Sequence, residues 1–276
     1  MKTISDTMGV SRASLYEKRH EGLPPRKRHY QKAQDADLLP LIREIVDARA
    51  TYGYPRVTAL LNRRLKKTGC PPVNRKRIYR IMKIHNLLLP KHTGRPIRVH
   101  DGEIVTLTSN MRWCSDVFEI GCWNGERVRV AFSMDCCDRE VISYVASTAG
   151  ISGDMVRDLA AETIESRFGL VDRVPHKIEW LSDNGSAYTA HETRMFASSM
   201  GLTVCTTPVQ SPESNGMAEA FIKTFKRDYV HLSRLENARV VMEQLPSWFE
   251  DYNENHPHKG LGMRSPREYR QSLAGT

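Results

Sequence analysis

Residues 112–148 read RWCSDVFEIGCWNGERVRVAFSMDCCDREVISYVAST, and this stretch decides the fold class. It holds three runs rich in β-branched and aromatic residues: RWCSDVFEI (112–120), ERVRVAFSMDC (126–136) and REVISYVAST (139–148). Asn124-Gly125 supplies a turn between the first two runs, and Cys137-Asp138 a tight turn between the last two. The stretch therefore predicts a meander of β-hairpins.

Helical and strand patterns alternate on the C-terminal side of the meander. The pattern predicts helices at 152–168, near 190–200, at roughly 214–231 and at 239–254, with strands at 177–181 and 202–207. This order is typical of an α/β fold, a mixed sheet with covering helices. The sequence contains no G-x-G-x-x-G or Walker A loop, so it gives no support for nucleotide binding.

Residues 35–86, on the N-terminal side, predict three helices. Gly53 permits a turn and Pro55 can open the second helix, while Asn74 is a suitable N-cap for the third. Lys76, Arg80 and Lys83 share one face of that third helix, opposite its apolar residues. A short basic helix closing a three-helix unit is what a helix-turn-helix module offers the DNA major groove. The alternative is a small helical bundle with a solvated basic face.

The charge distribution divides the chain in the same place. Among 276 residues with a net charge of +9, residues 1–100 carry 23 basic and 7 acidic side chains. Residues 101–276 carry 18 basic and 25 acidic ones. A basic half joined to a mildly acidic half indicates a nucleic-acid-gripping module attached to a second domain.

These patterns give four expected segments. They are a partial helix-turn-helix-like segment at 1–30, a helix-turn-helix-like DNA-binding module at 31–90, a basic linker at 91–110 and an α/β domain with a C-terminal helical extension at 111–276. No apolar stretch is long enough to span a membrane and no signal peptide is recognisable, so we expect a cytoplasmic protein. The six cysteines show no zinc-ligand spacing, and we expect all of them to be reduced and structural.

Three carboxylates stand out by their context. Asp116 lies inside the first apolar strand, Asp183 follows the strand KIEWL, and Glu219 lies early in the helix after SPESNG. A carboxylate in an apolar strand is costly unless it is paired or binds a metal, and divalent Mg²⁺ takes oxygen ligands. By contrast, we interpret Asp135 and Asp138 as strand-end and turn residues, and we expect His256 and His258 to form a turn rather than a metal site.

The order Asp116, Asp183 and Glu219, with 35 residues between the last two, resembles the D,D-35-E signature of retroviral integrases and related transposases. The words WCSD, DCCDRE, EWLSDNGS, SPESNGMAEAFIKTFKRDY and YNENHPHKGLGMRSPREY are similar to the second-frame (OrfB) protein of the IS3 insertion-sequence family, in particular its IS2 subgroup. The resemblance covers nearly the whole chain. It implies an RNase H-like core, preceded by the all-α module, that cuts and joins DNA with Mg²⁺ or Mn²⁺, in two ions, held by the three carboxylates.

The resemblance also implies partners. We expect double-stranded DNA (the element's terminal inverted repeats and the target), a homo-oligomer on DNA and an upstream first-frame protein as fusion or partner. The expected DNA contacts are Arg75, Lys76, Arg80, Lys83, Lys223, Lys226 and Arg227. Lys223 and Lys226 share a helical face with Glu219; the alternative for them is a solvated face. Two other functions stay open at this point: a non-catalytic DNA-binding regulator made from the second frame alone, and an RNase H-like nuclease without strand transfer.

Overall fold

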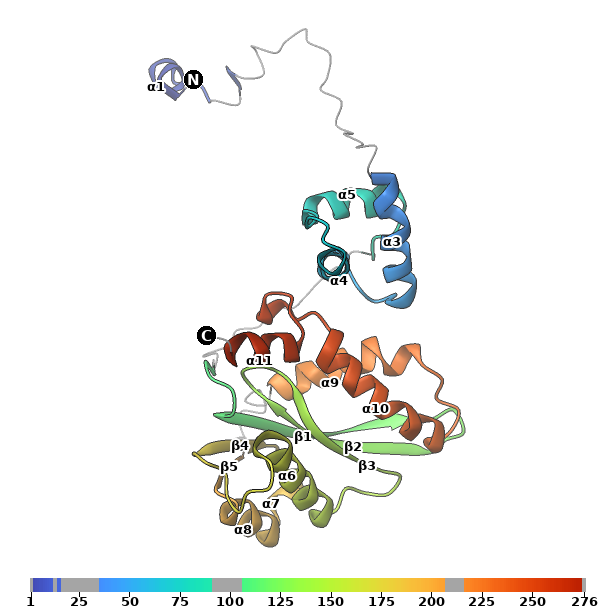
Figure 1. Cartoon of the computed structure of the whole chain (residues 1–276), viewed down its shortest axis with the longest axis vertical. Helices are drawn as coiled ribbons and strands as arrows, with labels where there is room; N and C mark the ends of the chain where they lie inside the picture. Colours follow the sequence, from blue (N-terminus) through green and yellow to red (C-terminus); the bar gives the residue numbers. More distant parts are fainter. Residues whose placement is uncertain (1, 12–13, 16–34, 91–105, 207–215, 275–276) are drawn as a thin grey trace. The chain divides into compact units, whose positions relative to one another are not determined.

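The computed structural model describes residues 2–11, 14–15, 35–90, 106–206 and 216–274 (Figure 1). They fall into two compact units, Met1–Leu41 and Ile42–Thr276. The first unit contains α1 (Lys2–Met8), after which the Ser11 hydroxyl accepts a hydrogen bond of 3.1 Å from the Ser14 N–H. Most of the predicted 1–30 segment and of the 91–110 linker lies outside the described residues.

Three helices form where the sequence predicts them. They are α3 (Asp35–Ala48), α4 (Tyr54–Lys67) and α5 (Arg75–Ile84). Gly53 is the N-cap of α4 and Pro55 lies in its first turn, where the absent N–H of proline costs nothing. Asn74 caps α5, its side chain accepting a hydrogen bond of 2.8 Å from the Lys76 N–H. Both predicted helix starts are confirmed.

A five-stranded mixed sheet follows in the chain, as expected. Its strands are β1 (Arg112–Gly121), β2 (Arg127–Asp135), β3 (Val141–Ser147), β4 (Ile178–Ser182) and β5 (Leu202–Thr206). The order is β3-β2-β1-β4-β5, in which β1, β2 and β3 pair antiparallel while β1, β4 and β5 pair parallel. The predicted meander is confirmed, and β1 lies at the centre of the sheet.

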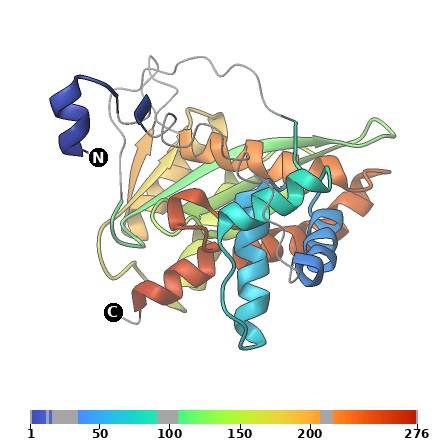
Figure 2. The ribbon, with the colours of Figure 1, turned by 90° about the horizontal axis from the view of Figure 1, so that it is seen from above.

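Helices cover both faces of the sheet (Figure 1). They are α6 (Gly153–Phe168), α7 (Ser186–Thr189), α8 (His191–Ser199), α9 (Gly216–Asp228) and α10 (Ala238–Asn255). One buried cluster joins Phe118 and Phe132 of the strands to Phe221 and Phe225 of α9 and to residues of α10. A second cluster on the other face joins Trp113 to α6 and α8. Seen from above, α9 and α10 lie across the first of these faces (Figure 2).

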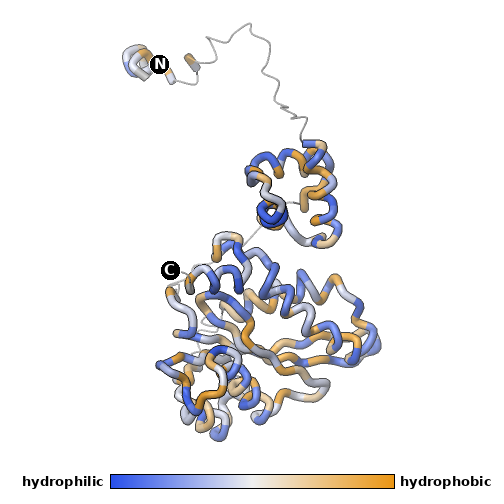
Figure 3. Tube along the Cα trace, in the orientation of Figure 1, coloured by the Kyte–Doolittle hydropathy of each residue, from blue (hydrophilic) through white to orange (hydrophobic). Residues whose placement is uncertain are grey.

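Side chains on β1 alternate between the two clusters. Cys114 and Phe118 belong to the α9 side, whereas Trp113 and Val117 belong to the α6 side. Figure 3 shows both hydrophobic and hydrophilic residues along the strands and helices of this domain. A central strand with apolar partners on both faces leaves its polar residues little access to water, and this gives Asp116 its unusual setting.

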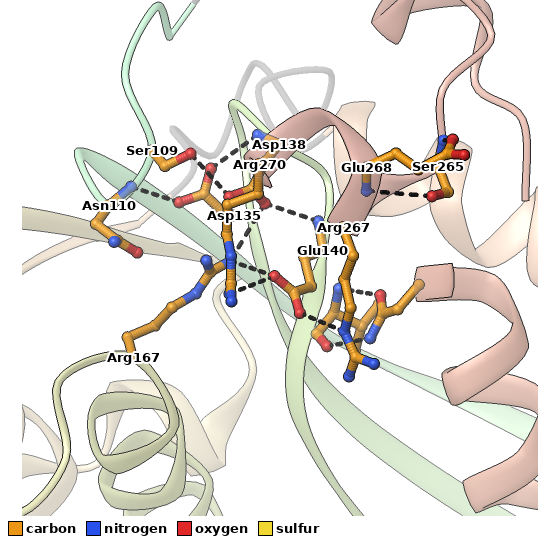
Figure 4. Close-up of polar contacts among 12 residues, drawn as sticks. Ser109, Asn110, Asp135, Asp138, Glu140, Arg167, Ser265, Arg267, Glu268 and Arg270 are labelled. Atoms are coloured by element: carbon orange, nitrogen blue, oxygen red, sulfur yellow. Dashed lines mark hydrogen bonds and ion pairs between the residues drawn. The ribbon is translucent and has the colours of Figure 1, made fainter. Parts of the chain in front are cut away.

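A buried network of charged side chains fixes the β2–β3 turn (Figure 4). Asp135 and Asp138 have the positions expected of them, but both are fully buried, which the sequence did not indicate. Asp138 accepts hydrogen bonds from the Ser109 hydroxyl (2.8 Å) and from the Arg167 guanidinium (3.2 Å) of α6. Asp135 accepts one from the Asn110 N–H (2.6 Å). The network thereby anchors the start of the α/β domain to the sheet.

The same network holds the last helix, α11 (Pro266–Ala274). Arg267 and Arg270 of α11 donate to the Glu140 carboxylate at 2.9 and 2.6 Å (Figure 4). Between α10 and α11 lie His256 and a short 3-10 helix, η3 (Lys259–Leu261). A second 3-10 helix, η2 (Val230–Leu232), follows α9.

All six cysteines are free thiols, but Cys70 is exposed, so the structural role expected for all six does not hold for it. No helix within the described ranges has the length and apolar character needed to cross a bilayer.

Candidate active site

The parallel pairing of β1 with β4 brings Asp116 and Asp183 to the same level of the sheet. Cys114 is paired with Leu181, and continuing that register by two residues sets Asp116 beside Asp183, the first residue after β4. Asp183 begins a tight turn in which its Oδ1 accepts a hydrogen bond of 3.0 Å from the Gly185 N–H. The two aspartates predicted from sequence are therefore neighbours across adjacent strands.

Glu219 belongs to α9, which packs on the face of the sheet that contains Cys114 and Phe118. It lies in the first turn of that helix and is exposed, while its neighbour Ala218 is buried against the sheet. The Phe225 ring packs edge-on against Phe118 with centroids 5.7 Å apart, and the Phe221 ring lies 4.6 Å from that of Phe132. These contacts hold α9 against β1 at Phe118, which is two residues from Asp116 along the strand.

The electrostatics of Asp116 report the convergence of all three carboxylates. Burial, together with the smaller effect of the negative charges of Asp183 and Glu219, raises the pKa of Asp116 to about 6. A hydrogen bond of 2.7 Å from the Val117 N–H opposes this increase in pKa. This repulsion indicates that Asp183 and Glu219 both lie near Asp116.

The carboxylate set fits a hard divalent cation. Its donors are all oxygens, and a bound cation would favour the charged form of Asp116, which burial and the neighbouring carboxylates disfavour. Within the described residues, no three His, Cys, Asp or Glu side chains are gathered at ligating spacing. The three carboxylates are thus neighbours rather than a closed cage.

A polar contact beneath the site was not predicted from the sequence. The buried Ser115 hydroxyl lies 2.7 Å from the hydroxyl of Tyr188 and donates to the Phe132 carbonyl at 2.6 Å. Tyr188 belongs to α7, which follows Asp183 directly, so the contact ties the Asp183 turn to β1. Ser115 lies within the word WCSD, but nothing in the sequence indicated its contact with Tyr188.

The predicted lysines of α9 differ in their surroundings. Lys223 is exposed, whereas Lys226 is half-buried, with its ammonium 5.9 Å from the centroid of the Phe118 ring. Lys226 therefore lies on the Asp116 side of the helix. Arg227 points elsewhere: its Nε and Nη2 both donate to the Asp228 carboxylate at 2.6 Å.

The basic face predicted for α5 is present. Arg75, Lys76 and Lys83 are exposed and Arg80 is half-buried, while Ile78, Ile81 and Met82 are buried on the opposite face. No acidic residue lies in the first turn of the helix. The exposed face is therefore cationic.

Asp228, at the end of α9, connects this helix to Thr51, which precedes α4, and to Arg56 in the first turn of α4. Its side chain is 1% exposed, and it accepts hydrogen bonds from the Thr51 hydroxyl (2.7 Å) and Arg56 (3.0 Å). Nearby, the Tyr52 hydroxyl lies 2.8 Å from Nδ1 of His256, and Arg49 pairs with Asp251 at 2.5 Å. These contacts could not be predicted from the sequence, because Asp228 is more than 170 residues away from Thr51 and Arg56 along the chain.

His256 is buried in this junction, and burial followed by nearby positive charge lowers its pKa well below the ordinary value. A neutral imidazole surrounded by tyrosine and arginine side chains matches the expected structural turn.

Comparison with known protein families supports the same division of the chain. Residues 32–95 match the family described as an HTH-like domain. Residues 108–212 and 200–266 match two families, each described as an integrase core domain. Together the two core matches cover the sheet, α9 and α10.

Curated relatives match over nearly the full length. The InsD transposase of insertion element IS2A/D/F/H/I/K from Escherichia coli is 44% identical over 276 residues, covering 98% of this chain and 91% of the relative. The InsD transposase of element IS2-9 from Escherichia coli strain K12 is 44% identical and is covered to 89%.

Similar solved structures include a simian T-cell lymphotropic virus intasome in complex with PP2A regulatory subunit B56 gamma (TM-score 0.48, 15% identity, 83% of this chain and 73% of that chain). Another is the Mos1 transposase catalytic domain with raltegravir and Mg (TM-score 0.44, 15% identity, 60% and 77%). The length and level of the identity to the InsD enzymes, together with the integrase core and HTH-like matches, decide the assignment: the chain belongs to the family of insertion-sequence DDE transposases that includes the IS2 enzymes.

Proposed function

We propose that Asp116, Asp183 and Glu219 are the catalytic carboxylates of this transposase. The observation that carries the assignment is their convergence: adjacent strands set the two aspartates side by side, and the charge of Glu219 contributes to the raised pKa of Asp116. The enzyme transfers DNA strands, and integrase cores depend on divalent metal. The three carboxylates are its best candidate ligands within the described residues.

We further propose that the bound metal is a pair of Mg²⁺ or Mn²⁺ ions. When bound, such ions lower the pKa of water and stabilise the leaving oxygen of a phosphodiester. The protein contributes by holding its carboxylates in fixed positions. Asp116 is fixed by β1, Asp183 by its hydrogen bond to Gly185, and Glu219 by the aromatic packing of α9.

Lys223 and Lys226 are proposed to hold DNA phosphates beside this site. Both follow Glu219 at helical spacing, at i+4 and i+7, and Lys226 lies against Phe118. A phosphodiester held in this way is in place for hydrolysis, which frees a 3′-hydroxyl. The same position then allows that hydroxyl to attack a second phosphodiester, so one site serves both cleavage and joining. Arg227 is a weaker candidate because its guanidinium is engaged by Asp228.

The remaining assignments concern DNA and partners. We propose residues 31–90 as the DNA-binding module, with Arg75, Lys76, Arg80 and Lys83 of α5 contacting the duplex, and residues 111–276 as the catalytic domain with its C-terminal extension. A homo-oligomer on DNA and a first-frame partner are proposed from the resemblance to the family. The enzyme would then act at nucleoid DNA of a bacterial cell.

A joining assay with labelled terminal inverted repeats tests the catalytic assignment. Glu219→Gln, Asp116→Asn and Asp183→Asn each keep side-chain size but remove a charged ligand. We expect cleavage and joining to fall by orders of magnitude, while DNA affinity persists because it rests on the basic half.

The matched control is Glu243→Gln, which neutralises an exposed glutamate of α10 and should leave joining unchanged. Near-normal joining by Glu219→Gln would contradict the assignment.

A further inference from the structure

An open groove of about 880 Å³ lies between α4 and the segment Gly262–Gln271. Four cationic side chains line it: Arg63, Lys66, Arg75 and Arg264. Glu268 is the single acidic residue of the lining. The groove is therefore strongly positive, although its C-terminal wall belongs to the acidic half of the chain.

Hydrogen bonds fix the two walls of the groove to each other. Arg63 of α4 donates to the carbonyls of Asn255 (2.8 Å) and Met263 (3.1 Å) and pairs with Glu268 at 2.6 Å. The end wall is held too, because the Asn62 side chain accepts from the Val73 N–H (2.8 Å) and donates to its carbonyl (3.1 Å). The groove is thus preformed and need not be created by a ligand.

The pairing of Arg63 with Glu268 leaves the other three cations of the lining available. Lys66, Arg75 and Arg264 are exposed, and none has an ion pair with an acidic residue in the described part of the chain, although Arg264 donates one hydrogen bond of 2.8 Å to the Ser272 hydroxyl. Three like charges along a fixed groove repel one another in the free protein. A polyanion that follows the groove relieves this repulsion and releases its own counterions.

Arg75 connects the groove to the basic face of α5, since it lines the groove and begins that helix. A duplex held on α5 has a backbone that continues past Arg75 toward Lys66 and Arg264. We propose that this groove binds the sugar–phosphate backbone of duplex DNA, which makes the Gly262–Gln271 segment a second DNA-contacting part of the transposase. This inference rests on the DNA-binding role proposed for α5, and the experiments below separate the two.

The first test compares two double variants of the full-length chain that remove the same charge. Lys66→Ala/Arg264→Ala removes two groove cations, whereas Lys67→Ala/Lys259→Ala removes two exposed lysines that do not line the groove. The salt dependence of affinity is measured on a duplex carrying the terminal repeat and on a duplex of random sequence. Two lost phosphate contacts should flatten the slope of log K against log salt by about 2 units on both duplexes.

The control double variant should keep the slope of the wild type. Equal flattening by both double variants would show a diffuse effect of net charge and would overturn the proposal, as would no flattening by the groove variant. The double variant Lys76→Ala/Lys83→Ala tests the role of α5 separately. If this variant loses DNA binding while the groove variant binds DNA like the wild type, α5 contacts DNA and the groove does not.

The second test uses Cys70, a natural thiol that lines the groove. Cys70 is exposed, Cys205 is half-buried, and the other four cysteines are buried. A maleimide should therefore label Cys70 first, and saturating duplex DNA should slow that labelling at least tenfold. Cys70→Ser supplies the background from the other cysteines.

Unchanged labelling of Cys70 under saturating DNA would overturn the proposal. The proposal would also be overturned if poly-glutamate slowed the labelling of Cys70 and duplex DNA did not. The groove would then be a site for an acidic protein segment.

Discussion

At the scale of single residues, Gly185 controls the space available to the Asp183 carboxylate. Its backbone angles are ordinary (φ −58°, ψ 141°), so the backbone itself tolerates a side chain. A Cβ at this position would lie 3.0 Å from Oδ1 of Asp183, the atom that accepts the Gly185 N–H hydrogen bond. The carboxylate would have to move by a few tenths of an ångström.

Gly185→Ala should therefore lower cleavage and joining roughly 10-fold, because misplacement of about 1 Å costs on the order of 100-fold. The measurements are joining of a labelled terminal repeat and the melting temperature, which should change little. Gly150→Ala is the control, since a Cβ there meets nothing within 4 Å. Normal joining by Gly185→Ala would mean that the position of Asp183 is not critical.

His258 gives a pH dependence that can be assigned to one residue. Burial, followed by the charges of Arg139 and Arg56, lowers its pKa to about 3. The ordinary pKa of histidine in an unfolded chain is about 6.5. Between these two values the unfolded chain binds a proton at His258 that the folded protein does not. Stability from this residue is therefore present above pH 6.5 and is lost as the pH falls.

His258→Gln should remove this proton-linked loss of stability. Below about pH 6 the free energy of unfolding of the wild type should fall relative to that of the variant, by at most about 1.4 kcal/mol per pH unit. The comparison between the two proteins is needed because the pKa of Asp135, which is raised to about 6, makes both proteins more stable as the pH falls. Urea unfolding at pH 7.5, 6 and 5 measures it, and parallel stability curves would contradict the assignment.

At the scale of elements, sequence periodicity predicted most of the fold. Every helix and strand expected between residues 35 and 255 is present, because strong apolar periodicity and local capping residues such as Asn74 determine these elements. The helix α11 was foreseen only as a helical extension. Its attachment depends on Arg267 and Arg270 pairing with Glu140, about 130 residues away, and no local pattern encodes such a contact.

The candidate site was predictable in part for the same reason. Asp116 and Asp183 could be placed at strand positions, and the spacing to Glu219 carried the family resemblance. The supports of the site could not be predicted: Ser115 looked like an ordinary strand residue and Tyr188 like a core aromatic. Asp135 and Asp138 were expected only as a strand-end residue and a turn residue, and their burial, which Arg167 and neighbouring backbone N–H groups permit, was not predicted.

At the scale of the whole molecule, charged side chains from residues 49–56 of the basic half contact the acidic half, and one of them, Arg56, pairs with the buried Asp228. Asp228 at the end of α9 accepts hydrogen bonds from Thr51 and Arg56, and Asp251 of α10 pairs with Arg49. The helix α9, which carries Glu219 in its first turn, is thus hydrogen-bonded at its C-terminal residue, Asp228, to Thr51 before α4 and to Arg56 in α4. An isolated fragment of residues 1–95 would lose these partners, so its DNA binding is best measured in the full chain.

The strength of this junction can be measured by a double-mutant cycle on Arg56 and Asp228. Their atoms are 3.0 Å apart, and the side chains are 23% and 1% exposed, so the pair is largely shielded from water. Removing Asp228 alone leaves both Arg56 and Arg227 without their carboxylate, whereas removing Arg56 and Asp228 together leaves only Arg227, whose side chain is 47% exposed to water. We therefore expect the double change Arg56→Ala/Asp228→Ala to cost less than the sum of the single changes, with a coupling energy of about 1–3 kcal/mol in denaturant unfolding.

Arg239 and Glu243 on α10 provide the comparison, because they form an exposed ion pair with side chains 81% and 62% exposed. Solvent screening should limit their coupling to about 0.5 kcal/mol or less. A coupling at Arg56–Asp228 that is no larger than this control would show that the junction contributes nothing specific. A large coupling would instead mean that the residues leading into α4 and the catalytic helix unfold together. Force or strain arising where DNA binds the basic half would then reach α9, and with it Glu219, through Asp228.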